Sequence, residues 1–232
     1  MTYSIWSRLF DLIAPRCCVI CHNRLAISEE VICTQCNLHL PRTHYASSAY
    51  DNEMARRFWG VLPIERAAAL FFYESKSEVT RLILQMKYSN HPEYGEVFGR
   101  MAAREFQSQQ FFEGIDALIP IPLAPNRQRQ RGYNQSLEIA RGVEAVTHLP
   151  ILTDAIRRKT FTESQTHKTR LERNENVNDV FELTPEADVS GKHILLIDDV
   201  VTTGATATAC GLELMKAKDV HISVLSLAFA KG

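Results

Sequence analysis

The chain of 232 residues is long enough for one domain of ordinary size with a small appended module. Its hydrophobic fraction of 45% can fill a packed core, so the composition excludes an intrinsically disordered protein. A formal net charge of -1 excludes a surface that is basic all round, so any binding of nucleic acid must be confined to local patches.

The N-terminal segment from Tyr3 to Pro15 carries the apolar stripe of a short amphipathic helix. Arg8 and Asp11 interrupt it and no small-residue cleavage site follows, which argues against a signal peptide. We expect it to dock on the body of the protein, with a membrane surface as the alternative. No apolar run approaches the roughly 20 residues that cross a bilayer, so we expect no membrane span.

Cysteines crowd the first forty positions and form two regular pairs, Cys18-x2-Cys21 and Cys33-x2-Cys36. Without an export signal, such clustering indicates a metal site in a reducing compartment, so we predict a structural zinc ion and a cytoplasmic protein. A slip to Cys17 as the first ligand is the alternative. About forty residues bury too little apolar surface to fold alone, and a metal supplies the missing free energy.

We predict three regions: a zinc knuckle or ribbon with the N-terminal helix over 1–46, a linker or wrapped segment over 47–66, and the main domain over 67–232. In the main domain, short apolar runs alternate with segments of helical periodicity, which predicts an α/β fold with a mostly parallel sheet. Strands are expected over 67–73, 116–121, 193–198 and 220–229, and helices over 78–88, 94 to about 112, 134–146 and 205–217.

Four apolar residues, Ile194 to Ile197, are followed directly by Asp198 and Asp199 and then by a loop that enters a helix. Ligands of parallel sheets bind at the carboxyl ends of the strands, where two adjacent carboxylates can serve different partners. In the loop, backbone N–H groups, hydroxyls and the positive end of the helix converge on a phosphate. The loop consists of Thr202, Thr203, Gly204, Ala205 and Thr206.

The stretch from Ile194 to Thr206 resembles the signature of the type I phosphoribosyltransferases. The resemblance implies a Rossmann-like sheet and a site for 5-phosphoribosyl-1-pyrophosphate (PRPP). It implies that Asp198 and Asp199 meet the ribose hydroxyls, that Thr202 to Thr206 hold the 5-phosphate, and that Mg2+ lies on the pyrophosphate side. Thr202 stands where purine salvage enzymes of the superfamily carry an aspartate, and threonine cannot act as that base, which argues against purine salvage.

Further motifs, Ile119-Pro120-Ile121-Pro122-Leu123, Arg131-Gly132-Tyr133-Asn134-Gln135 and a stretch from Thr162 to Phe181, are similar to those of the ComF family of competence proteins. The likeness covers nearly the whole chain. It implies a zinc knuckle joined to a phosphoribosyltransferase domain, and a role in DNA uptake during natural transformation with proteins of the uptake machinery as partners.

Two basic segments could complete the site. Arg127, Arg129 and Arg131 follow the strand at 116–121, where the resemblance places pyrophosphate, and Arg131 lies inside the family motif. Lys87-Tyr88 is a weaker candidate for the same end of the ligand. The basic segment from Lys159 to Glu182 is interpreted as a lid that keeps water from the reacting sugar, with a plain surface loop as the alternative.

Three functions fit these residues. The first is an enzyme that transfers phosphoribosyl from PRPP to an unidentified nitrogen acceptor, with Mg2+ bound alongside PRPP. The second is a single-stranded-DNA-binding competence factor in which the zinc module and the arginines contact phosphates. The third is a sensor that binds PRPP without turnover.

Overall fold

The computed structural model describes residues 15–159 and 180–231. The helix expected over Tyr3 to Pro15 and most of the expected lid therefore lie outside the described residues. Over the described part of the chain, no helix is long and apolar enough to cross a membrane.

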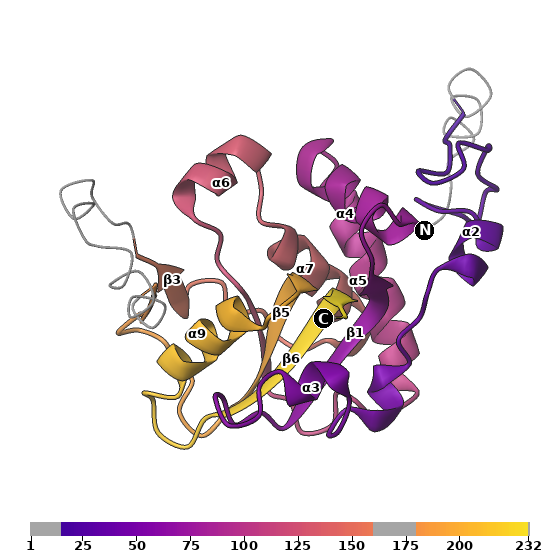
Figure 1. Ribbon diagram of the computed structural model, residues 1–232. Helices are drawn as coiled ribbons and strands as arrows, with labels where there is room; N and C mark the ends of the chain where they lie inside the picture. The colour runs from indigo at the N-terminus through magenta and orange to yellow at the C-terminus, as the bar shows by residue number, and fades with distance from the viewer. Residues whose placement is uncertain (1–14, 160–179, 232) are drawn as a thin grey trace.

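A four-stranded parallel sheet in the order β1-β6-β5-β2 forms the centre of the main domain. The strands span Arg66–Tyr73 for β1, Ala117–Pro120 for β2, His193–Val201 for β5 and His221–Ala230 for β6. Their carboxyl ends lie at the top of Figure 1. The predicted α/β class with a parallel sheet is confirmed.

Helices cover both faces of this sheet (Figure 1). On one face lie α5 and α7, and on the other lie α3 and α9. The helices are α2 (Thr34–His39), α3 (Glu53–Arg56), α4 (Glu78–Tyr88), α5 (Glu93–Gln107), α6 (Pro125–Arg131), α7 (Gln135–Thr147) and α9 (Ala205–Leu214).

Local sequence accounts for most helix boundaries. Ser77 begins α4 by accepting a hydrogen bond from the backbone N–H of Thr80, and Asn134 begins α7 by accepting one from Ser136. The helix expected from Tyr94 to about Phe112 was too long, since α5 ends at Gln107. Its continuation folds into turns in which Gln110 has a φ of 57°. The expected basic loop at 127–131 is also different, because Pro125 begins a short helix there.

The segment over 47–66 packs on the sheet. Asn52 Nδ2 donates to the backbone oxygens of Ser48 and Ala67 at 3.0 and 2.8 Å, and Phe58 and Leu62 are fully buried. Tyr45–Ser48 forms a short 3-10 helix (η1) at its start.

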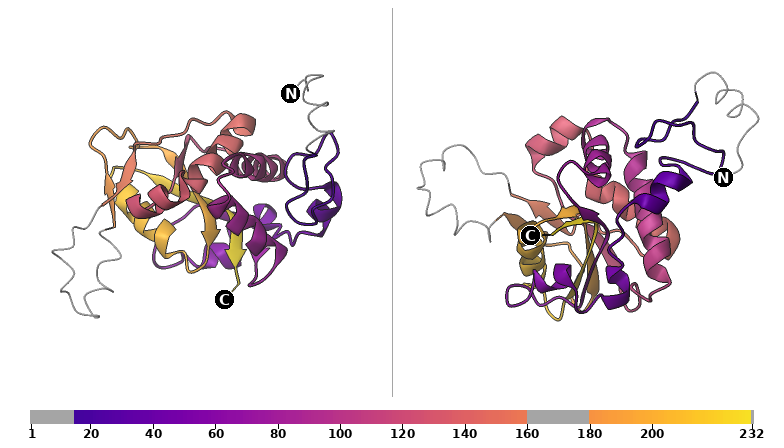
Figure 2. Two further views of the ribbon diagram at one scale, coloured as in Figure 1. Left: turned by 90° about the horizontal axis from the view of Figure 1, so that it is seen from above. Right: turned by 45° about the vertical axis from the view of Figure 1, so that its right-hand side comes forward.

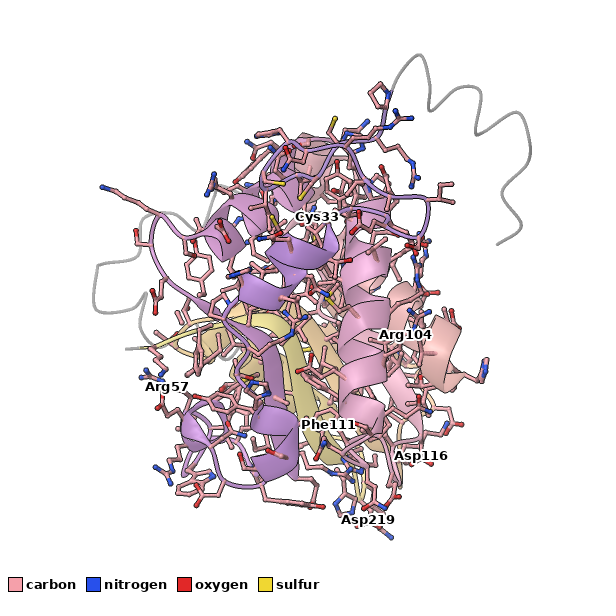
Figure 3. All side chains as sticks on the ribbon, turned by 90° about the vertical axis from the view of Figure 1, so that its right-hand side faces the viewer. Cys33, Arg57, Arg104, Phe111, Asp116 and Asp219 are labelled. Atoms are coloured by element: carbon pink, nitrogen blue, oxygen red, sulfur yellow. The ribbon has the colours of Figure 1, made fainter. Side chains whose placement is uncertain are left out.

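The cysteine-bearing segment lies against the outer side of α5, across the molecule from a small antiparallel pair, β3 (Ile156–Arg158) and β4 (Phe181–Leu183), as Figures 1 and 2 show. Ion pairs join it to α5: Glu30 with Arg100, and Arg42 with Glu105 at 2.9 Å. In Figure 3, Cys33 lies at one end of the molecule, and Asp116, just before β2, at the other.

Helices α5 and α7 approach closely at glycines. A Cβ added at Gly99 would lie 2.2 Å from the backbone oxygen of Ile139, and one at Gly142 would lie 2.2 Å from that of Glu96. Neither backbone can move without displacing the whole helix, so glycine at these positions sets the distance between the helices.

We predict that Gly99→Ala lowers the free energy of unfolding by about 1–3 kcal/mol, because overpacking outweighs the better helix propensity of alanine. Urea denaturation measures the change. Arg104→Ala, at an exposed position of the same helix, is the matched control and should change stability much less. Equal stability of Gly99→Ala and wild type would contradict the close helix contact.

Candidate functional site

The acidic pair lies inside β5 rather than after it. The strand was expected to end at Asp198, but it continues to Val201, because β6 keeps pairing with it through Val201 opposite Phe229. On the other side, pairing with β2 ends earlier, at Pro120 opposite Ile197. Both carboxylates therefore lie beyond the end of β2, at an edge that only β6 continues to cover.

Asp198 points toward the start of α7. Its Oδ1 accepts hydrogen bonds from the backbone N–H of Asp199 at 2.8 Å and from Ser136 Oγ at 3.5 Å. Burial, and after it the charge of Asp199, raise the pKa of Asp198 from 3.8 to about 7. Near neutral pH this carboxyl group can therefore either donate or accept a proton.

Asp199 is held by cations. Its Oδ2 lies 2.9 Å from Lys87 Nζ at the end of α4 and 4.0 Å from Arg131 Nη1 at the end of α6. All three side chains are largely shielded from water, with exposed fractions of 13% for Asp199, 18% for Lys87 and 9% for Arg131. An ion pair so shielded is weakly screened by salt, so this contact fixes α4 and α6 relative to β5.

The predicted phosphate loop turns outward from the same edge. Gly204 has a φ of 80° and starts α9, and a Cβ added there would lie 3.0 Å from Phe58 Cε1. Four of its residues are exposed to solvent: Thr202, Thr203, Ala205 and Thr206. The first turn of α9 has no acidic residue and Gly204 makes no side-chain cap, so no carboxylate competes for its N–H groups, of which that of Ala205 donates to Thr203 Oγ1 at 3.4 Å.

The other arginines lie differently. Arg127 and Arg129 are exposed on α6, whereas Arg131 at the end of this helix reaches Asp199. In β3, burial, and then the charge of Arg127, lower the pKa of Arg158, and the charge of Asp198 opposes that shift. The guanidinium carbon of Arg158 lies 5.3 Å from the ring centroid of Phe181, in the opposite strand of the pair.

A cavity of about 730 Å³ lies away from this edge, beneath the β3–β4 pair. It is lined by residues 151–157 together with Thr184, Glu186, Ala187, Asp188 and Lys192. None of the predicted site residues lines it, and its two cations are paired, Lys192 with Asp188 at 2.7 Å and Arg157 with Glu182 at 3.0 Å. We therefore place the candidate site at the carboxyl edge of the sheet.

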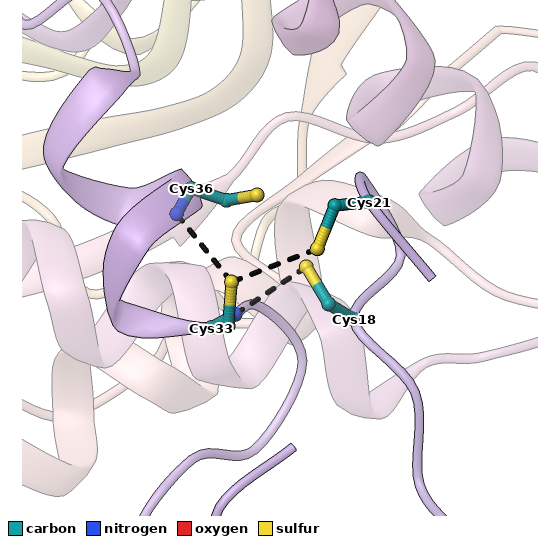
Figure 4. A group of neighbouring side chains, drawn as sticks. All are labelled: Cys18, Cys21, Cys33 and Cys36. Carbon is teal, nitrogen blue, oxygen red and sulfur yellow. Dashed lines mark hydrogen bonds between the residues drawn. The ribbon is translucent and has the colours of Figure 1, made fainter. Parts of the chain in front are cut away.

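The N-terminal module gathers Cys18, Cys21, Cys33 and Cys36, whose sulfur atoms all lie within 4.8 Å of one another (Figure 4). Cys21 Sγ is 3.7 Å from Cys33 Sγ. This matches the spacing of about 3.8 Å between thiolates that share a tetrahedral zinc ion with Zn–S bonds of about 2.3 Å. The cluster is therefore consistent with a structural zinc site.

Cys17 lies apart from this cluster, and its Sγ donates to the backbone oxygen of Pro15 at 3.4 Å. Burial alone would raise the pKa of Cys18, but hydrogen bonds from the backbone N–H groups of Cys21, Cys33 and Ile20 outweigh burial and lower the pKa to about 7. Burial and the neighbouring thiols raise the pKa of Cys36. A cation among the sulfurs would favour all four thiolates together.

No protein-family profile matches the chain. Curated proteins do match it over most of its length. DNA utilization protein YhgH of Escherichia coli K12 is 26% identical over 202 residues, covering 86% of this chain and 84% of its own. Competence protein ComFC of Bacillus subtilis is 28% identical, with 93% and 86% covered, and competence protein F of Haemophilus influenzae is 23% identical, with 92% and 96% covered.

Over most of its length the chain is therefore similar to proteins named YhgH and to competence proteins of the ComF kind. Among solved structures, adenine phosphoribosyltransferase from Leishmania tarentolae aligns with 77% of this chain and 88% of its own, at 10% identity and a TM-score of 0.36. A likeness at that score carries no argument about the site.

Sequence reasoning gave little weight to one residue that contacts the acidic pair and did not name others near it. Lys87 was only a weak candidate for pyrophosphate, and Tyr88 was grouped with it, yet Lys87 makes the shortest ion pair of Asp199. Ser136 and Arg158 were not candidates at all. The Asn134 that begins α7 was quoted only as a motif residue, and its Nδ2 also donates to Ile121 O at 3.1 Å, which ties α7 to the end of β2.

We predict that Asp198→Asn stabilises the protein increasingly as the pH rises. Because the folded pKa of about 7 exceeds the value of 3.8 for an ordinary carboxyl, the folded protein holds a proton that the unfolded chain has released within this window. The contribution of Asp198 to stability therefore falls between about pH 4 and pH 7. The Tm difference between variant and wild type should grow over this window and stay level above it.

The control is Asp219→Asn, which replaces an exposed carboxylate at the amino end of β6. This variant should show no comparable growth of its Tm difference between pH 5 and pH 8. A Tm difference for Asp198→Asn that is constant from pH 4 to pH 8 would show that the carboxyl group ionises in its ordinary range.

Proposed function

We propose that this protein binds PRPP at the carboxyl edge of its sheet and transfers the phosphoribosyl group to a nitrogen acceptor. The observation that carries the proposal is that one edge presents two carboxylates, two cations and an outward-facing helix start. Asp198 and Asp199 supply acceptors for the ribose hydroxyls. The turn from Thr202 to Thr206 supplies donors for the 5-phosphate.

The charges suit the leaving group as well. Lys87 and Arg131 border Asp199. In the proposed reaction the C1–O bond breaks and its electron pair leaves with pyrophosphate, while the acceptor nitrogen forms the new C1–N bond and releases its proton to solvent. Cations near the leaving oxygens stabilise the developing negative charge. When bound with PRPP, Mg2+ would neutralise part of the pyrophosphate charge.

The second candidate is a DNA-handling role, and the names of the relatives favour it. One group of relatives is called DNA utilization proteins and another competence proteins. We propose that the PRPP site serves such a process, in which single-stranded DNA and uptake-machinery proteins are partners. The alternative function, a sensor that binds PRPP without turnover, would use the same binding site and would differ from the enzyme only in that no phosphoribosyl group is transferred.

Isothermal titration calorimetry with PRPP and Mg2+ tests the binding site. We expect Asp199→Asn to lower the affinity for PRPP by at least about tenfold, because charge-assisted hydrogen bonds to the ribose are lost. Asp219→Asn should bind as wild type does. The absence of PRPP binding by the wild-type protein would contradict both the enzyme and the sensor.

Pyrophosphate release across a panel of nitrogen acceptors then separates these two, since a sensor binds PRPP without releasing pyrophosphate. For the DNA role, electrostatic binding requires that affinity for single strands falls with added salt. An affinity for single-stranded DNA that does not change with salt, and that stays the same when Arg127, Arg129 and Arg131 are replaced, would contradict contact between these arginines and the phosphates.

The four-cysteine cluster is proposed to hold one structural zinc ion. We expect Cys21→Ser to lose zinc and to lower the Tm, because three thiolates and a hydroxyl bind zinc far more weakly than four thiolates. Cys17→Ser is the matched control, since Cys17 lies outside the cluster, and should retain the zinc content of the wild type. Elemental analysis of the purified variants measures their zinc content, and thermal denaturation measures their Tm. Equal zinc loss in the two variants would contradict the assignment.

A further inference from the structure

The segment over 47–66 packs against α9 directly behind the phosphate turn. Phe58 and Leu62 are fully buried. A Cβ added at Gly204, where α9 begins, would lie 3.0 Å from Phe58 Cε1, and one added at Gly211 would lie 2.6 Å from Leu62 Cδ2. The segment therefore follows α9 in close contact from its start, and the residues next to Phe58 have a fixed position beside the turn.

Arg57, the residue before Phe58, reaches the carboxyl end of the sheet on this side. Its guanidinium carbon lies 5.8 Å from the ring centroid of Phe229. Phe229 is opposite Val201 in the register of β5 and β6, and Thr202, the first residue of the turn, follows Val201 directly. Figure 3 shows Arg57 at the surface of the molecule. Both its main chain and its guanidinium are therefore next to the turn.

The neighbouring arginine is engaged in a different way. Arg56 Nε lies 2.7 Å from Asp51 Oδ1, and its guanidinium carbon lies 5.7 Å from the ring centroid of Trp59. In the part of the chain that the structure describes, no carboxylate lies within 4.0 Å of Arg57. An aromatic face attracts a guanidinium but does not neutralise its charge, so Arg57 can pair with an anion that arrives from solvent.

The charge of a 5-phosphate exceeds what the turn itself can offset. A phosphate monoester carries about two negative charges near pH 7. The start of a helix supplies about half a positive charge, and the side chains from Thr202 to Thr206 add hydroxyls but no cation. Lys87 and Arg131 contact Asp199, at the end of the site that we assign to pyrophosphate. A further cation at the turn would complete the balance of charge.

We infer that Arg57 binds the 5-phosphate of PRPP, and that the segment over 47–66 is in this way part of the substrate site. The inference rests on the proposed phosphoribosyl site. The guanidinium would leave the face of Phe229 and donate two N–H groups to phosphate oxygens, while the packing of Phe58 on Gly204 holds the main chain in place. Arg57 thus favours phosphorylated sugars over free sugars.

Two fragments of PRPP, each carrying one of its phosphate ends, test this directly. By calorimetry, we expect Arg57→Gln to lower the affinity for ribose 5-phosphate and for PRPP by at least about fivefold, because a charge-assisted contact at a partly solvated phosphate is lost. The affinity for inorganic pyrophosphate with Mg2+ should stay at the wild-type value, because pyrophosphate binds at the other end of the site.

Arg57→Lys, which keeps the charge but not the planar fork, should lose less affinity for ribose 5-phosphate than Arg57→Gln. Arg56→Gln is the matched control, since it removes the adjacent exposed arginine, and should bind all three ligands as wild type does. Because both arginines are exposed, we expect all these variants to keep the Tm of the wild type.

An unchanged affinity of Arg57→Gln for ribose 5-phosphate would overturn the inference and leave the phosphoribosyl site intact. An equal loss of affinity for pyrophosphate, or an equal loss in Arg56→Gln, would overturn it too, because the effect would then come from the overall surface charge. If neither PRPP nor ribose 5-phosphate binds the wild-type protein, the phosphoribosyl site itself is wrong, and the role of Arg57 is wrong with it.

Discussion

The candidate site depends on the unequal length of the two strands that flank β5. The backbone N–H of Ile121 donates to Ile197 O at 3.0 Å, and Pro122 then follows, which has no N–H to continue the ladder. On the other side, β6 pairs with β5 as far as Val201. Asp198 and Asp199 therefore stand on a strand that is rigid along one edge and uncovered along the other.

The uncovered edge is occupied by side chains from three helices. Ser136 comes from the start of α7, Lys87 from the end of α4 and Arg131 from the end of α6. Two carboxylates at adjacent positions repel each other, and the cations and hydrogen bonds offset this repulsion unequally. Asp199 receives both cations, whereas Asp198 is left with a raised pKa. A ligand that brings hydroxyls to this edge would compete with Lys87 for Asp199.

The four-cysteine module and the candidate site share α5 as a common support. Glu30 pairs with Arg100 on one side of this helix, and on another side Gly99 lies against the backbone of α7. The start of α7 in turn supplies Ser136 to Asp198.

The sequence alone determined the α/β class, most strand and helix positions, the paired cysteines and the acidic pair with its turn, because each depends on residues close together in the chain. The exact bounds of α4 follow from its cap and its helical spacing, for example. The predicted end of β5 was wrong, because pairing with β6, and not the local sequence pattern, decides where the strand ends. Only the tertiary structure joined Lys87 and Arg131 to Asp199 and Ser136 to Asp198, because these residues are distant in sequence and meet only when the sheet edge assembles.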